Sequence, residues 1–220
     1  MSVKKKNLIA AIVNTVIVIA TAFCLVTFFT KGGNGNMKSF GFVMFRYFTV
    51  DSNVFCALSS LCLLPCEYAA ALNGKTRLPK WAQIFKLMGT VTVTLTMLVV
   101  IAFLLPMTGD FSGMYGGVNF YLHLAGPIMA VYSFCFLEND NMLDKAKGVI
   151  PVAPILIYGI VYFVMVIVIG PERGGWPDFY MFNMGGRWYI AVGAIAAVSL
   201  LISMGEFALN QRRFKNVRKS

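Results

Sequence analysis

The chain contains one histidine, His123, which lies about six residues, or roughly 9 Å, inside an apolar stretch long enough to cross a membrane. A second apolar stretch opens with R-Y-F-T-V-D-S-N, residues 46–53, and places Thr49 about eight residues, or roughly 12 Å, deep. A threonine hydroxyl is a poor nucleophile unless an adjacent base takes its proton. A neutral imidazole can take that proton and return it to a leaving group. Thr49 and His123 therefore predict acyl-transfer chemistry at matching depth in two helices that run in the same direction.

Four further polar side chains share these segments and could support such chemistry: Arg46, Asp51, Asn53 and Asn119. Helical spacing predicts that Arg46 and Asn53 lie on the stripe of Thr49, and that Asn119 lies one turn above His123. These amide and guanidinium groups could donate hydrogen bonds to an oxyanion. Asp51 falls on another stripe, where it would pair with a different helix or cap Tyr47. In the alternative interpretation, the same polar groups form a buried network that holds the helices together.

The elements that position these residues are predicted to be transmembrane helices. Of the 220 residues, 58% are hydrophobic and 13% are charged, and about 20 apolar residues span a bilayer core. Six stretches are long enough: residues 8–29, 41–71, 84–106, 117–137, 149–169 and 188–209. The second is overlong, which suggests tilt or a distortion near Pro65. The sequence thus predicts an all-α, polytopic membrane protein with one six-helix transmembrane domain over residues 1–220.

Basic residues gather at both ends of the chain and in alternate connections. They are Lys4, Lys5 and Lys6 before the first stretch, Lys75, Arg77, Lys80 and Lys86 in the second connection, Lys145 and Lys147 in the fourth, and Arg212, Arg213, Lys215, Arg218 and Lys219 in the tail. Because cytoplasmic flanks are enriched in lysine and arginine, this asymmetry predicts a cell-membrane protein with both termini in the cytoplasm. The net charge of +10 fits flanks that meet anionic head groups, so it does not indicate nucleic-acid binding.

The remaining reactive groups in the apolar stretches give weaker signals. One histidine and few intramembrane acids leave no ligand set for a metal, so we expect no metal and no cofactor. The five cysteines form no C-x-x-C pair, which favours buried thiols that pack as small hydrophobic groups. The third stretch carries Thr90, Thr92, Thr94 and Thr96. Their hydroxyls either bond to carbonyls of their own helix or line a polar cavity or pathway.

The segment R-Y-F-T-V-D-S-N at 46–53 and the H-L-A-G-P at 123–127 resemble motifs of the androgen-induced protein family. Relatives in that family include the androgen-dependent regulator of tissue factor pathway inhibitor and many bacterial six-helix proteins. The W-P-D-F-Y at 176–180 is similar to the bacterial branch. Animal members are threonine hydrolases that cleave fatty acid esters of hydroxy fatty acids with one threonine and one histidine. The resemblance implies a six-helix fold, Thr49 as the nucleophile and His123 as its partner.

Three functions remain open at this point. The leading hypothesis is a membrane-embedded hydrolase of lipid acyl esters, with a membrane lipid or a fatty acid ester as substrate. The alternative is a small-solute or proton-coupled transporter that uses Arg46, Asp51 and His123 as a relay. It needs a polar path to the cytoplasmic side, for which the inner halves offer only Asn14, Glu67 and the threonines of the third stretch. The third is a non-enzymatic membrane partner subunit, and the sequence leaves the oligomeric state undetermined.

Overall fold

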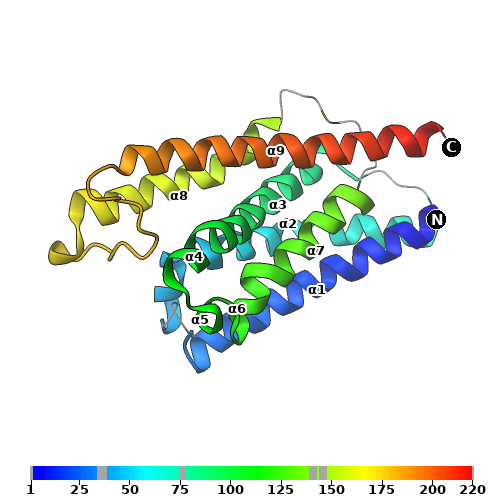
Figure 1. Cartoon of the computed structure of the whole chain (residues 1–220). Coiled ribbons are helices and arrows are strands. Elements are labelled where there is room, and N and C mark those ends of the chain that lie inside the picture. The colour runs from blue at the N-terminus through cyan, green and yellow to red at the C-terminus, as the bar shows by residue number, and fades with distance from the viewer. Residues whose placement is uncertain (1, 34–38, 75–77, 139–142, 144–147, 220) are drawn as a thin grey trace.

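The computed structural model describes residues 2–33, 39–74, 78–138, 143 and 148–219, with side chains as far as Arg212. Every regular element in these ranges is a helix (Figure 1). Six helical segments are long and apolar enough to cross a membrane: Val3–Thr30, Phe48–Asn73, Lys80–Thr108, Val118–Leu137, Ile150–Ile169 and Trp188–Arg212. Each overlaps one predicted stretch, in agreement with an all-α, multi-pass membrane protein. Four basic residues of the charge argument, Lys75, Arg77, Lys145 and Lys147, lie outside the described ranges.

Three of the spans are single α-helices, and the other three combine α-helical with π-helical or 3-10 turns. The single helices are α1 (Val3–Thr30), α2 (Phe48–Asn73), which continues through Pro65, and α9 (Trp188–Lys219). The third span comprises α3 (Lys80–Val99), η3 (Val100–Leu104) and α4 (Leu105–Thr108). The fourth comprises α6 (Val118–Phe120), η4 (Tyr121–Ala125), α7 (Gly126–Tyr132) and η5 (Ser133–Leu137). The fifth comprises η7 (Ile150–Val152), α8 (Ala153–Phe163) and η8 (Val164–Ile169), and the connections carry η2 (Gly41–Arg46), α5 (Phe111–Tyr115) and η9 (Pro171–Arg173).

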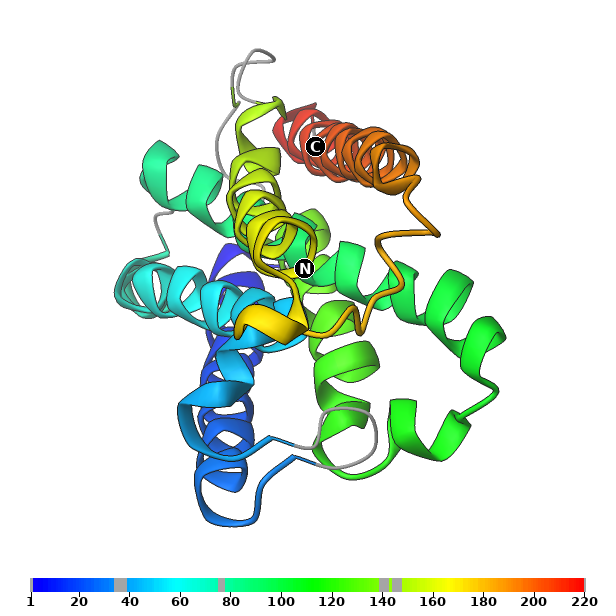
Figure 2. The ribbon, with the colours of Figure 1, turned by 90° about the vertical axis from the view of Figure 1, so that its left-hand side faces the viewer.

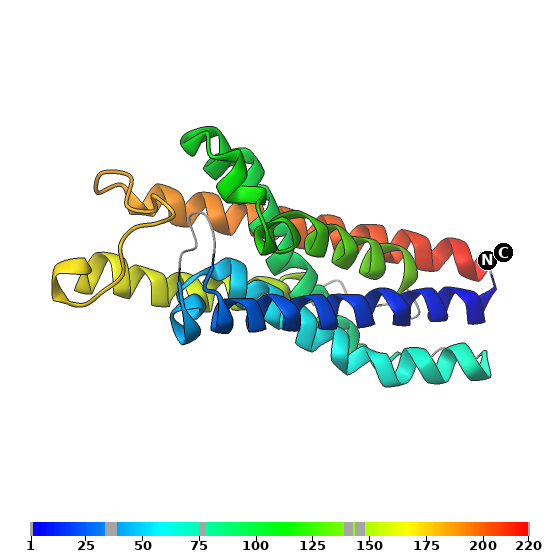
Figure 3. The same ribbon diagram turned by 90° about the horizontal axis from the view of Figure 1, so that it is seen from below.

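Helix α3 runs through the centre of the bundle. In the most apolar part of the third span, 61% of the residues are buried, compared with 22% in the fifth span and 17% in the sixth. Helices α1 and α2 pack along each other on one side of α3, while α8 and α9 lie on the other (Figures 1 and 2). Both termini lie at the same end of the bundle, which we call the terminal side (Figure 3). The central position of α3 explains why its polar residues are enclosed by protein.

The second span begins later than the sequence predicted. Residues Gly41–Arg46 form the 3-10 helix η2, and Tyr47 has an extended backbone (φ −97°, ψ 122°), so α2 starts directly after it. Thr49 therefore lies in the first turn of α2 and not eight residues inside a continuous helix. The prediction that Arg46 shares a stripe with Thr49 is wrong, because the break at Tyr47 separates the two. Asn53 keeps its predicted place one turn below Thr49.

A proline makes the fourth span irregular at its centre. The Gly126 N–H bonds to the Tyr121 carbonyl, which is the i to i+5 bond of a π-turn. The next carbonyl, that of Leu122, would then need the N–H of residue 127, which is Pro127 and has none. An amide from α2 fills this role, since Asn53 Nδ2 donates to the Leu122 carbonyl at 3.0 Å. The H-L-A-G-P sequence thus frees a carbonyl that ties the second span to the fourth.

Candidate functional site

Thr49 lies in the first turn of α2, and its neighbours Ser52 and Asn53 bond to two other spans. On one side of it, Asn53 donates to the Leu122 carbonyl of η4; on the other, the Ser52 hydroxyl pairs with the Thr96 hydroxyl of α3 at 2.9 Å. In an α-helix the direction of Thr49 falls between those of Ser52 and Asn53. Thr49 is buried, with only 4% of its surface exposed.

His123 is held by the short helix α5. Its Nδ1 lies 2.6 Å from the Met114 carbonyl oxygen, and because a carbonyl only accepts, Nδ1 carries the hydrogen. In the neutral imidazole the lone pair is then on Nε2, as a general base requires. One turn earlier, Asn119 Nδ2 donates to the Gly113 carbonyl at 2.7 Å. His123 and Asn119 thus hold two consecutive carbonyls of α5, a positioning role that the sequence did not indicate.

The helix that holds the imidazole packs on the third span, which the Thr49 stripe also faces. Met114, whose carbonyl bonds to His123, is buried in one cluster with Val100 and Leu104 of η3. Leu122, which directly precedes His123, packs in a different cluster, together with Val50 of α2 and Cys24 of α1. The third span therefore contacts both α2, which carries Thr49, and α5, whose Met114 carbonyl holds the His123 ring.

Asn53 fixes the spacing between α2 and the fourth span. Its Nδ2 donates to the Thr49 carbonyl at 2.8 Å and to the Leu122 carbonyl at 3.0 Å. The contact is tight, because a Cβ on Gly126 would lie 3.0 Å from Asn53 Oδ1 and 3.1 Å from Cζ of Tyr121. The glycine of H-L-A-G-P is thus required for this close approach, and the backbones of the predicted nucleophile and base are joined through one amide.

Tyr180, which the sequence argument overlooked, brings a second hydroxyl to Thr49. It belongs to the connection between the fifth and sixth spans, and its phenolic oxygen is buried beside the Thr49 side chain, the Phe48 backbone and the Tyr158 hydroxyl. That oxygen makes no hydrogen bond of good geometry to any described residue. Burial raises the pKa of Tyr180 to about 12, so its hydroxyl stays protonated at neutral pH and can donate. In the sequence, the aromatic W-P-D-F-Y segment at 176–180, which ends with Tyr180, was the feature that could have indicated this residue.

Two of the predicted supporting residues, Arg46 and Asp51, have other contacts. The Arg46 guanidinium lies 5.0 Å from the ring centroid of Tyr47 and 6.0 Å from that of Phe179, and it donates to the Tyr47 hydroxyl at 2.9 Å. Asp51 lies in the first turn of α2, where the helix dipole favours a carboxylate. Its contact with Tyr47 is made by the backbone N–H, which bonds to the Tyr47 carbonyl at 3.2 Å, and not by the carboxylate.

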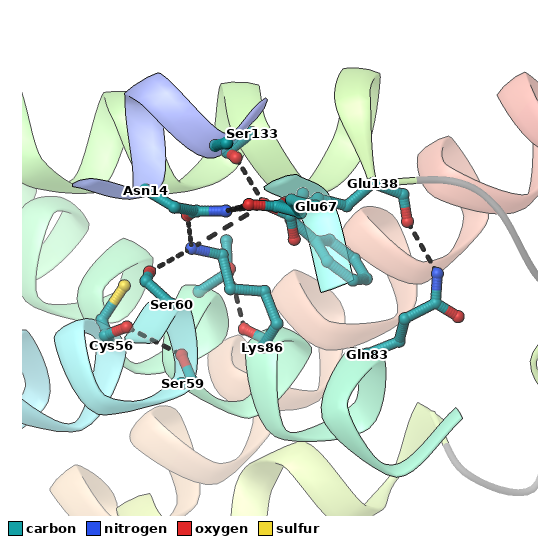
Figure 4. Close-up of polar contacts among 12 residues, drawn as sticks. Asn14, Cys56, Ser59, Ser60, Glu67, Gln83, Lys86, Ser133 and Glu138 are labelled. Atoms are coloured by element: carbon teal, nitrogen blue, oxygen red, sulfur yellow. Dashed lines mark hydrogen bonds and ion pairs between the residues drawn. The ribbon is translucent and has the colours of Figure 1, made fainter. Parts of the chain in front are cut away.

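A second polar cluster, on the terminal side, was largely missed from the sequence (Figure 4). We call it the terminal-side cluster, and it comprises Asn14, Ser60, Glu67, Lys86, Ser133 and Glu138. The assignment of Lys86 to a connection is wrong, because α3 begins at Lys80 and the Lys86 side chain is fully buried. Glu138, directly after η5, is also fully buried. The half of the bundle on the terminal side is therefore more polar than the sequence suggested.

The threonines of α3 satisfy their hydroxyls mainly within their own helix. Thr90, Thr92 and Thr96 donate to carbonyls three or four residues earlier. Thr94 donates instead to Glu206 Oε1 of α9 at 2.6 Å, and the Thr96 hydroxyl also meets Ser52 of α2. These hydroxyls therefore link α3 to its neighbours as well as capping its own carbonyls.

Comparison with known proteins adds no further constraint on the site. No known protein family, no curated protein and no solved structure matches the chain. Across the described ranges, no three histidine, cysteine, aspartate or glutamate side chains gather where they could hold a metal ion. The geometry around Thr49 and His123 is therefore the basis for a functional assignment.

Proposed function

We propose that this protein is a membrane-embedded hydrolase of lipid acyl esters, with Thr49 as nucleophile and His123 as general base. The observation that carries the proposal is the hydrogen bond from His123 Nδ1 to the Met114 carbonyl, since it leaves Nε2 as the basic nitrogen of a buried imidazole. The two hydrogen bonds from Asn53 Nδ2 to the Thr49 and Leu122 carbonyls support it, because they keep the two helices in a fixed relation. The family resemblance points to the same two residues.

In the proposed reaction, Thr49 Oγ1 attacks the ester carbonyl carbon while His123 Nε2 takes the hydroxyl proton. The tetrahedral intermediate collapses, the alkoxide of the leaving hydroxy acid takes that proton, and the acyl group stays on Thr49. Water then attacks the acyl-threonine, His123 accepts one of its protons, and that proton returns to Thr49 Oγ1 as the fatty acid leaves. The protonated Tyr180 hydroxyl beside Thr49 is a donor available to the oxyanion.

The proposed substrate is a fatty acid ester of a hydroxy fatty acid, or a membrane lipid with an equivalent ester. Its acyl chains dissolve in the bilayer, and Thr49 lies in the first turn of α2, at the end of the bundle away from the termini. We place the protein in the cell membrane with both termini in the cytoplasm, because Lys4, Lys5 and Lys80 are exposed on the terminal side. The ester would then enter laterally from the outer leaflet.

A fluorophosphonate probe tests the proposal with paired variants. Purified wild-type protein should be labelled, Thr49→Val should not, and Thr49→Ser should keep labelling because it retains a hydroxyl. His123→Asn should also abolish labelling. An asparagine Nδ2 can still donate to the Met114 carbonyl, so this variant removes the base while it keeps the hydrogen bond to α5.

The matched control is Thr27→Val, whose hydroxyl bonds only to the Phe23 carbonyl of its own helix. It should be labelled like the wild type. Labelling of Thr49→Val at the wild-type level would eliminate the hydrolase. A His123→Asn protein that is stable and fully labelled would reduce His123 to the positioning of α5.

A proton-coupled transporter is the second candidate, and the terminal-side cluster is the observation that favours it. The relay needs polar groups in the inner half of the bundle, and Lys86, Glu67 and Glu138 are buried there. Charged groups at such depth commonly mark ion or proton paths. Uptake into proteoliposomes that follows a pH gradient and fails in Asp51→Asn would support transport over hydrolysis.

A further inference from the structure

Glu206 is an acidic residue of α9 that lies against the middle of the third span. It is 5% exposed, and its Oε1 accepts a hydrogen bond from the Thr94 hydroxyl at 2.6 Å. Thr94 is the central residue of the span Lys80–Thr108. The carboxyl group of Glu206 therefore lies far from both ends of that span, where an ionised side chain is most costly.

The groups next to this carboxyl are neutral. Phe207, the next residue of α9, packs on the apolar cluster that contains Leu95 of α3 and Cys135 of η5. Oε2 of Glu206 is buried and makes no hydrogen bond to any described residue. In the described part of the chain, the Thr94 hydroxyl is thus the one donor to this carboxyl group. One neutral hydroxyl does not replace the water that an ionised carboxylate loses on burial.

No cation pairs with Glu206 within the described ranges. The neighbouring helix α3 carries Lys86, but the Lys86 ammonium donates to Asn14 Oδ1 and Ser60 Oγ, which belong to α1 and α2. Lys86 also precedes Thr94 by eight residues, which is roughly 12 Å along the helix. A carboxylate at Glu206 would therefore be a buried charge without a partner.

The other titratable groups near Glu206 are acids. The thiols of Cys56 on α2 and Cys135 on η5 lie within its electrostatic reach, and Glu138 acts on the same two thiols. The segment η7 carries no titratable side chain, and the two tyrosine hydroxyls of α8 have partners on the side of the bundle away from the termini. The acids can only add negative charge, so they oppose ionisation of Glu206.

We propose that Glu206 is a proton-binding site and that its protonated carboxyl group seats α9 on α3. Because Thr94 donates to Oε1, the proton is carried by Oε2, and it exchanges with water when α9 moves away. Holding this proton removes the cost of an unpaired buried charge. Helix α9 depends on such contacts, since only 17% of the residues in the most apolar part of the sixth span are buried. The site is distinct from Thr49 and His123, so it does not depend on the proposed hydrolase activity.

Infrared spectroscopy of the purified full-length protein tests whether the proton is bound. A protonated carboxyl group has a carbonyl stretch above the amide I band, and that stretch shifts in D2O. At neutral pH, Glu206→Gln should remove one such band from the wild-type spectrum. Thr94→Val should keep the band but move it to higher wavenumber, because the carbonyl oxygen then loses the hydrogen bond that it accepts. Glu172→Gln, at an exposed position of η9, is the matched control and should leave the band unchanged.

Two infrared results would overturn the proposal. A Glu206→Gln protein that loses no band would show that Glu206 is ionised in the wild type. A band that is lost in Glu206→Gln but does not move in Thr94→Val would show that the protonated carboxyl group is not seated on Thr94.

Alkylation of Cys135 tests whether the proton seats α9. Cys135 is fully buried, and its Sγ lies 3.8 Å from the Glu206 carbonyl oxygen, so a reagent reaches it only when α9 moves away. Labelling by N-ethylmaleimide would be measured by mass spectrometry of the Cys135 peptide in wild type and in Glu206→Gln, which cannot ionise. Between about pH 5 and pH 7, the ratio of wild-type to variant labelling should rise by up to about ten-fold per pH unit, because the seated carboxyl holds a proton that an exposed one has released. A constant ratio, or no labelling of Cys135 in either protein, would show that proton loss does not unseat α9.

Discussion

Asn53 Nδ2 lies 3.0 Å from the Leu122 carbonyl oxygen, and this one hydrogen bond joins the helix of the predicted nucleophile to that of the predicted base. The carbonyl is available because Pro127 has no N–H to offer it. In membranes, backbone groups freed by a proline are often satisfied by neighbouring helices. We therefore expect the contribution of the Asn53 side chain to stability to depend on Pro127, and this dependence can be measured.

Asn53→Ala should destabilise the protein by about 1–3 kcal/mol, because it leaves the buried Leu122 carbonyl unpaired. In a Pro127→Ala background the same change should cost less by about 1 kcal/mol, since residue 127 then supplies an N–H to that carbonyl. Thermal denaturation in detergent gives the double-mutant cycle. Asn7→Ala, whose side chain bonds only to the Val3 carbonyl of its own helix, is the control. Equal costs in both backgrounds would contradict the proposed dependence.

Gly126→Ala should destabilise the bundle by about 1–3 kcal/mol, because the added methyl group meets Asn53 Oδ1 at 3.0 Å and the Tyr121 ring at 3.1 Å. Gly193→Ala on α9 is the matched control, since nothing lies within 4 Å of its Cβ position. It should be neutral or stabilise slightly through helix propensity. The measurement is the melting temperature of each variant compared with that of the wild type. A Gly126→Ala protein as stable as the wild type would show that the fourth span can move away from α2.

Tyr180→Phe should change how stability depends on alkaline pH. Burial raises the pKa of Tyr180 from 10.0 to about 12, so folding favours the neutral phenol. The resulting stability is fully present below pH 10 and is lost as the pH rises from 10 toward 12. Wild-type protein should therefore lose more stability over this interval than Tyr180→Phe. The measurement is the melting temperature at each pH, with Tyr189→Phe at an exposed position as control; parallel curves for wild type and Tyr180→Phe would refute the expectation.

The proposed orientation predicts the behaviour of reporter fusions. Green fluorescent protein fused after Ser220 should fluoresce, because the carboxyl terminus is placed in the cytoplasm. Alkaline phosphatase fused after Gly174, which directly follows η9 between the fifth and sixth spans, should be active, since this connection lies at the other face of the membrane. An active phosphatase at the carboxyl terminus would reverse the orientation. The leaflet from which substrate enters would then change as well.

The amino-acid sequence was sufficient to predict six apolar helices, because their length and composition are set by the thickness of the bilayer core. It also singled out His123, since one imidazole among apolar residues stands out without any tertiary information. It could not predict that the second span breaks at Tyr47, because aromatic residues flank the break on both sides and no proline or glycine marks it. For that reason, the prediction that Arg46 and Thr49 lie on one stripe of a helix is wrong.

Other features depended on which helices meet. Lys86 looks like a flanking residue in the sequence, and only the packing of α3 against α1 and α2 turns its ammonium toward Asn14 and Ser60. Tyr180 lies beside Thr49 although about 130 residues of chain separate the two. Helical periodicity does not predict this contact, because it shows which residues share a face of one helix and not which other segment packs against that face. The sequence by itself therefore determined the six apolar elements. The tertiary structure alone decided the partners of each polar group, because burial forces such groups to pair with whatever the neighbouring helix presents.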